Sequence, residues 1–150
     1  MRKYLAGFLL IIYAGALSAN QDSDFLTARK AFQAGNSKLL AEYADRLTDH
    51  VLSPYVDYYQ LRSILRTTDV SNIRNFLSRH EGTLVADRLR SDWLKMLGKN
   101  QQWQLFDAEY PLLVNKDTEL SCYVYQRQLS AKDKEVVQAI RDVWLTAGNM

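Results

Sequence analysis

The chain has 150 residues, of which 47% are hydrophobic, 11% aromatic and 24% charged. This balance is typical of a globular protein, and it excludes a disordered chain, a collagen-like repeat and a disulfide-dense miniprotein. The 19 Lys and Arg against 17 Asp and Glu give a net charge of +2, so no basic footprint indicates nucleic-acid binding. Only six Gly and two Pro are present, which disfavours a many-stranded β-sandwich.

Residues 1–19 have the three-part pattern of a secretory signal peptide. Arg2 and Lys3 form a cationic start, the run from Tyr4 to Leu17 is apolar, and small residues follow it. A retained membrane anchor is the alternative, but this run is shorter than the about 20 apolar residues that span a bilayer. The pattern therefore predicts export, cleavage after residue 18 or 19, and no stable membrane anchor afterwards.

Residues 20–150 repeat with a period of about 32 to 33 residues, within the range of solenoid repeats. The repeat aligns on four apolar anchors: Phe32, Leu65, Leu97 and Leu129. In every copy the positions four before, eight after and eleven after the anchor are apolar or small. This spacing is typical of two amphipathic helices joined by a tight turn. It predicts an all-α fold of about four antiparallel helix pairs, stacked as a TPR-like α-solenoid.

Turn and capping residues are expected between these helices. Polar breaks divide the pairs at 34–37, 67–69, 98–101 and 130–133. We expect Ser53, which precedes Pro54, and Ser71 to be helix N-caps. Three glycines that follow helical runs are expected to adopt the left-handed stop conformation: Gly35, Gly82 and Gly98.

Few residues suggest chemistry. His50 and His80 lack metal-ligand spacing, and a helix-capping role is expected for His80. Asp45 and Asp49 are four residues apart, but we expect a solvated surface pair there, and no catalytic dyad. Aromatic side chains at helical spacing are expected in the core, in preference to a sugar-binding surface: Tyr55, Tyr59, Trp93 and Tyr125. We predict no catalytic, cofactor-binding or metal-ligating residue.

Cys122 is the only cysteine. In an exported protein a lone cysteine indicates a free thiol, an intermolecular bond or a missing partner, and a buried reduced cysteine is the structural alternative. A nucleophilic role is disfavoured because no Gly-rich or His-containing segment surrounds it. The last predicted helix pair has no polar capping helix after it, so we expect the chain to be cut short and the partner of Cys122 to be missing.

Four segments resemble, in order, landmarks of the soluble lytic murein transglycosylase family. L-S-P-Y-V-D-Y at 52–58 is similar to its P-Y-x-[DE]-Y element. R-L-R-S-D-W-L-K-M-L-G-K-N-Q-Q-W at 88–103 resembles a W-L-x-x-L helix followed by a G-K turn and a second Trp. E-L-S-C-Y at 119–123 and W-L-T-A-G at 144–148 resemble two further landmarks. Residues 20–150 are thereby similar to the start of the family's superhelical, U-shaped N-terminal domain.

The resemblance implies a periplasmic location and peptidoglycan as the target of the full-length enzyme. Members of the family cleave the glycan between N-acetylmuramic acid and N-acetylglucosamine and leave a 1,6-anhydro end. Their catalytic Glu lies in an E-S-x-[FY] segment of a lysozyme-like domain, where it acts as acid and then as base. None of the five Glu here precedes Ser, so we predict that this domain is absent and that the chain alone is inactive.

The resemblance also implies the partners of the segment. The family has a second cysteine shortly after the W-L-T-G landmark, so Cys122 is implied to be half of a disulfide whose partner lies beyond the C-terminus. The rest of the superhelix and the catalytic domain are implied partners in cis. Two alternatives stay open, a free-standing periplasmic helical-repeat adaptor and a cytosolic TPR-like scaffold that retains residues 1–19.

Overall fold

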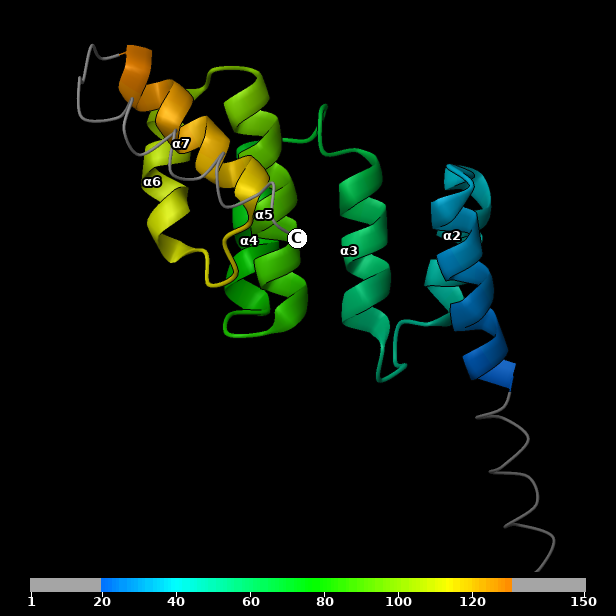
Figure 1. Ribbon diagram of the computed structural model, residues 1–150. Coiled ribbons are helices and arrows are strands. Elements are labelled where there is room, and N and C mark those ends of the chain that lie inside the picture. Colours follow the sequence, from blue (N-terminus) through cyan, green and yellow to red (C-terminus); the bar gives the residue numbers. More distant parts are fainter. Residues whose placement is uncertain (1–19, 131–150) are drawn as a thin grey trace, which may run out of the picture. The chain divides into compact units, whose positions relative to one another are not determined.

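The computed structural model describes residues 20–130 (Figure 1). They fall into two compact units, the first ending at Asn75 and the second beginning at Phe76. Two predictions fall outside the described residues: the signal peptide at 1–19, and the second helix of the fourth pair, which is predicted within 131–150.

The first unit contains a helix over 20–33, followed by α2 (Ser37–Arg46) and α3 (Ser53–Ser63). Gly35 lies in the turn after this first helix, and its φ of +67° is the left-handed conformation expected of it. The Asn36 side chain then caps α2 by accepting the Leu39 N–H at 3.0 Å. α2 packs against α3, so the first predicted helix pair is followed directly by a third packed helix.

Aromatic rings pack against one another between helices of the first unit. Phe32 stacks on Tyr59 with ring centroids 4.6 Å apart, and Tyr58 lies 5.6 Å from Tyr59. Tyr58 and Tyr59 are both buried. The core prediction is confirmed for Tyr59, whereas Tyr55 and Tyr125 are only half-buried.

α4 (Val70–Arg79) crosses the boundary between the units. The second unit continues with α5 (Leu84–Lys99), α6 (Trp103–Glu109), the short 3-10 helix η1 (Tyr110–Leu112) and α7 (Thr118–Ser130). α5 packs against both α6 and α7. Its buried face forms most of the core, with contributions from the two neighbouring helices: Leu89, Trp93, Leu94, Leu97, Phe106 and Leu120.

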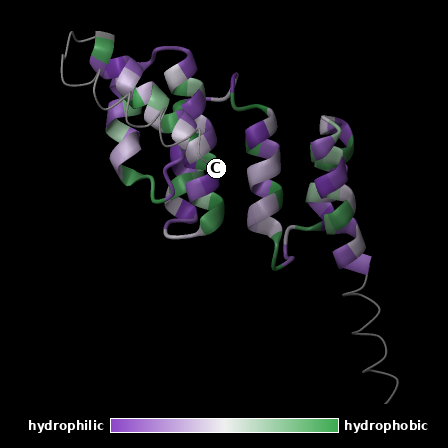
Figure 2. Ribbon diagram, in the orientation of Figure 1, coloured by the Kyte–Doolittle hydropathy of each residue, from purple (hydrophilic) through white to green (hydrophobic). Residues whose placement is uncertain are grey.

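The described residues contain helices and turns and no strand, so the all-α prediction is confirmed for this part of the chain. Polar and apolar residues share each helix (Figure 2), as expected for helices with one buried face. The predicted turn at 67–69 lies between α3 and α4. The predicted turn at 34–37 runs into Ser37, the first residue of α2, and the one at 98–101 begins within the last two residues of α5. Over residues 20–130, no helix has both the length and the apolar character needed to cross a bilayer.

Three expected helix ends are wrong. Ser53 is the first residue of α3, which follows Leu52 without a side-chain cap, and Ser71 lies inside α4. Gly98 lies inside α5, and the residue in the left-handed conformation is Gln101, with φ of +57°. The Gln102 N–H closes this helix end by donating to the Leu97 carbonyl at 2.9 Å.

Gly98 is required for a different reason, the close approach of α7. A Cβ placed on Gly98 would lie 2.5 Å from Cγ and 2.7 Å from Cδ1 of Tyr123. These atoms belong to a ring on the neighbouring helix and cannot move away independently. The glycine therefore sets how closely α5 and α7 pack.

Candidate functional site

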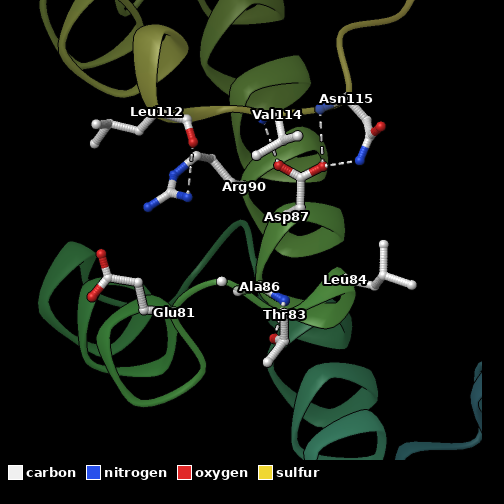
Figure 3. A pocket seen from close by; sticks show the side chains of 10 residues that line it. Glu81, Thr83, Leu84, Ala86, Asp87, Arg90, Leu112, Val114 and Asn115 are labelled. Carbon is white, nitrogen blue, oxygen red and sulfur yellow. Dashed lines mark hydrogen bonds between the residues drawn. The ribbon is translucent and has the colours of Figure 1, made fainter.

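A pocket of about 370 Å³ lies at the start of α5 (Figure 3). The turn after α4, the first turns of α5 and the segment between η1 and α7 meet there. We call it the α5 pocket, and these residues line it: Glu81, Gly82, Thr83, Leu84, Ala86, Asp87, Arg90, Leu112, Val114 and Asn115.

The turn into α5 is built by two residues. Gly82 has φ of +75°, which a residue with a side chain adopts only with strain. Thr83 follows in an extended conformation as the N-cap, and its Oγ1 accepts the Ala86 N–H at 3.3 Å. The same hydroxyl donates to the His80 carbonyl at 2.6 Å. This cap begins the helix so that Asp87 and Arg90 face the segment after η1.

Asp87 holds the segment after η1 on α5. Its Oδ1 accepts the Val114 N–H at 2.8 Å, and its Oδ2 accepts the Asn115 N–H at 3.1 Å and the Asn115 Nδ2 at 2.8 Å. Figure 3 shows the carboxylate pointing at the backbone of this segment. We call Asp87 with Val114 and Asn115 the Asp87 clamp.

The clamp keeps Asp87 ionised. Only 9% of the residue is exposed, and burial alone would raise the pKa of its carboxyl. The hydrogen bonds from Val114 and Asn115, together with the nearby Arg90, outweigh burial and lower the pKa below its ordinary value of 3.8.

Two further charged residues of α5 contact the stretch of chain from the end of α6 to the start of α7. Arg90 Nη1 donates to the Leu112 carbonyl at 3.2 Å, and its Nε lies 3.5 Å from Glu109 Oε2. Lys95 Nζ lies 2.6 Å from Asp117 Oδ2 and 3.2 Å from Glu119 Oε2. The hydrogen bond to Asp117 raises the pKa of Lys95, against the effect of burial.

These charges support a structural role and no proton transfer. A general acid at neutral pH needs a raised pKa, whereas the pKa of Asp87 is lowered and three donors already contact its oxygens. Arg90 is paired with Glu109. Within residues 20–130, no three His, Cys, Asp or Glu side chains are grouped to hold a metal ion. Asp87 and Arg90 therefore hold the segment around η1 against α5.

The residues considered from the sequence lie elsewhere. Cys122 is exposed on α7 and forms no disulfide with a described residue. His50 packs on Phe25, its Nδ1 accepts the Leu52 N–H at 3.2 Å, and its Nε2 lies 3.2 Å from Asp22 Oδ1.

The other considered side chains are also not among those that line the α5 pocket. His80 directly follows α4, and its ring packs on Phe76 at 4.6 Å. Asp45 and Asp49 are both exposed, as expected for a surface pair. Trp93 is completely buried, as predicted.

Sequence reasoning missed the Asp87 clamp, although a signal for it exists. Asp87 and Asp22 both lie ten residues before an anchor of the repeat, and their partners Asn115 and His50 both lie 18 residues after it. A search for polar pairs 28 residues apart would have found both. The close approach of Tyr123 to Gly98 has no comparable signal in the sequence.

Comparisons with known proteins show one relationship. The chain is 24% identical over 153 aligned residues to the soluble lytic murein transglycosylase of Escherichia coli K12, and equally to that of E. coli O157:H7. The alignments cover 97% of this chain and 23% of each relative, so the chain spans about a quarter of their length. No family model matches it, and neither does any solved structure. The predicted resemblance is confirmed as distant similarity.

Proposed function

We propose that this chain forms the non-catalytic, N-terminal helical part of a periplasmic protein related to the soluble lytic murein transglycosylases. The observation that carries the proposal is the similarity over 97% of the chain to 23% of each relative. The predicted alternation of helices and turns over residues 20–130 supports it. In a longer protein, the segment would serve the cleavage of peptidoglycan glycan strands by a catalytic domain in cis.

The proposal includes stacking of the helix pairs as an α-solenoid. The sequence period of about 32 to 33 residues supports this arrangement. Equivalent polar contacts in two copies, from Asp22 to His50 and from Asp87 to Asn115, give further support. Small-angle X-ray scattering on the purified chain would test it, because a stacked array and a compact bundle of the same mass differ in radius of gyration.

An assay on murein sacculi tests the lack of catalysis. Purified chain, a mock preparation and the E. coli enzyme are incubated with sacculi, and soluble 1,6-anhydromuropeptides are measured by mass spectrometry. We expect products only with the E. coli enzyme, because none of the five Glu of this chain precedes Ser, as the catalytic Glu of the family does. Products from the chain above the mock level would overturn the proposal.

Location and the role of the cysteine are tested separately. We propose that residues 1–19 direct export, and mass spectrometry of protein from a periplasmic fraction should show an N-terminus at residue 19 or 20. We also propose that Cys122 pairs with a cysteine of a longer chain, and its exposure on α7 supports this. In a longer translation product, a non-reducing peptide map should then contain Cys122 in a disulfide-linked pair.

A free-standing helical-repeat adaptor is the second candidate. The exposed apolar side chains around the α5 pocket favour it, because such patches mark interaction sites. The nucleotide sequence downstream of codon 150 separates the candidates. An in-frame continuation to an E-S-x-[FY] segment supports the first, and a stop codon supports the adaptor.

A further inference from the structure

Three large apolar side chains at the α5 pocket face solvent. Leu84 is 74% exposed, Leu112 56% and Val114 81%, and all three line the pocket. Large apolar side chains are normally exposed singly, whereas a group of them around a hollow marks an interaction site.

The fold holds these side chains outward. Asp87 accepts the Val114 and Asn115 N–H groups, so the backbone faces α5 at this point. Leu113 is buried and the side chain of its neighbour Val114 points outward. Arg90 similarly holds the Leu112 carbonyl. The exposed side chains are therefore preorganised, which lowers the entropy lost when a partner binds.

The charge of the pocket is unbalanced. Its lining holds two carboxylates, Glu81 and Asp87, and one guanidinium, Arg90, which sum to −1. Asp87 and Arg90 have the partners described above. Glu81 is exposed, and no ion pair links it to any of the described residues. The pocket thus combines an apolar rim with one free negative charge.

We propose that the α5 pocket docks a segment of a partner protein that presents an apolar side chain flanked by Lys or Arg. The apolar side chain would pack on Leu84, Leu112 and Val114, and the basic side chain would pair with Glu81. The inference does not depend on the proposed function.

Other occupants fit the pocket less well. A glycan would need aromatic faces to stack on, and none of the lining residues is aromatic. A phosphate group would be repelled by Glu81. A small molecule needs a site that encloses most of its surface, whereas the rim residues Leu84 and Val114 are largely in water.

Peptide titrations test the proposal. Nitrogen-15-labelled chain is titrated with the capped peptide Gly-Lys-Leu-Lys-Gly, and with the matched peptides Gly-Glu-Leu-Glu-Gly and Gly-Lys-Ser-Lys-Gly. We expect saturable shifts of the Leu84, Val114 and Asn115 amide signals with the first peptide only. Glu81→Gln should weaken its binding roughly fivefold, as expected for the loss of one exposed charge contact. Leu84→Ser should abolish it.

Val51→Ser is the matched control, because Val51 is 84% exposed in the turn between α2 and α3 and is not one of the residues that line the pocket. This variant should bind the peptide like the unmodified chain, and thermal melts should show that all three variants fold. Equal shifts with the acidic peptide, no shifts with any peptide, or shifts of the same amides by a chito-oligosaccharide would each overturn the proposal.

Discussion

Asp22 and Asp87 occupy equivalent positions in the sequence repeat, ten residues before Phe32 and Leu97 respectively. Each contacts a side chain 28 positions further along, His50 for Asp22 and Asn115 for Asp87. In both cases a carboxylate on one helix contacts the turn that follows the next helix. The two contacts differ in burial, since the Asp22 side chain is 75% exposed and Asp87 is buried.

Replacing Asp87 by Ala should lower the free energy of unfolding by about 2 to 3 kcal/mol, because three donors lose a charged acceptor. Urea unfolding followed by circular dichroism measures the change. Arg88→Ala is the control, since Arg88 is exposed on the same helix and its loss should change stability by no more than about 0.5 kcal/mol. Equal effects of the two variants would contradict a stabilising role for the clamp.

Replacing Asp22 by Ala should lower the free energy of unfolding much less than replacing Asp87 by Ala does. The pair between Asp22 and His50 is mostly in water at the carboxylate, and exposed pairs contribute roughly 0 to 1 kcal/mol. The same urea unfolding experiment applies. A loss as large as that of Asp87→Ala would show that burial does not decide the strength of this repeated contact.

Replacing His50 by Ala should lower the free energy of unfolding more than replacing its partner Asp22 by Ala does. The His50 side chain is only 7% exposed, it packs on Phe25, and it accepts the Leu52 N–H. Its removal leaves a cavity and an amide without an acceptor, which together should cost about 2 to 3 kcal/mol. Urea unfolding measures both variants. If His50→Ala lowers the free energy of unfolding as little as Asp22→Ala does, the His50 ring does not stabilise the turn between α2 and α3.

The stabilisation by Asp87 should depend on pH. Hydrogen bonds hold its folded-state pKa below 3.8 despite burial, so the unfolded chain binds the proton more readily. This contribution is fully present above pH 3.8 and is lost as the pH falls through the folded-state pKa. The difference in unfolding free energy between the unmodified chain and Asp87→Asn, measured from about pH 7 to about pH 2.5, should therefore shrink on acidification. A difference that stays constant or grows would contradict this assignment.

Gly98→Ala should destabilise the chain, although Ala favours helices over Gly by about 1 kcal/mol. The new methyl group would overlap the Tyr123 ring, and overpacking of this kind costs about 1 to 3 kcal/mol. Combining it with Tyr123→Ala is the control, because the space vacated by the ring accommodates the methyl group. In the Tyr123→Ala variant, Gly98→Ala should leave the thermal stability unchanged or raise it. If Gly98→Ala lowers the melting temperature equally with and without the Tyr123 ring, the close contact between Gly98 and Tyr123 is contradicted.

Helix positions could be read from the sequence because the relevant signal is local. An apolar residue every three or four positions around Phe32 and Leu97 is enough to indicate a helix with a buried face. The other two anchors differ, since Leu65 lies in the turn after α3 and Leu129 is 44% exposed. Gly35 and Gly82 marked helix ends correctly, since a left-handed residue is required there whatever packs nearby. Ser53 and Ser71 were misplaced because helices often begin one or two residues from the nearest capping residue.

Only the tertiary structure decided the contacts that form the candidate site. Asp87 reads as an ordinary surface residue of α5 until Val114 and Asn115, far along the chain, bring their N–H groups to it. Gly98 reads as a helix stop until Tyr123 is placed against it. Hydrophobic periodicity depends on neighbours within two turns of a helix, whereas burial and hydrogen-bond partners depend on which distant segments meet, and a single sequence does not encode that locally.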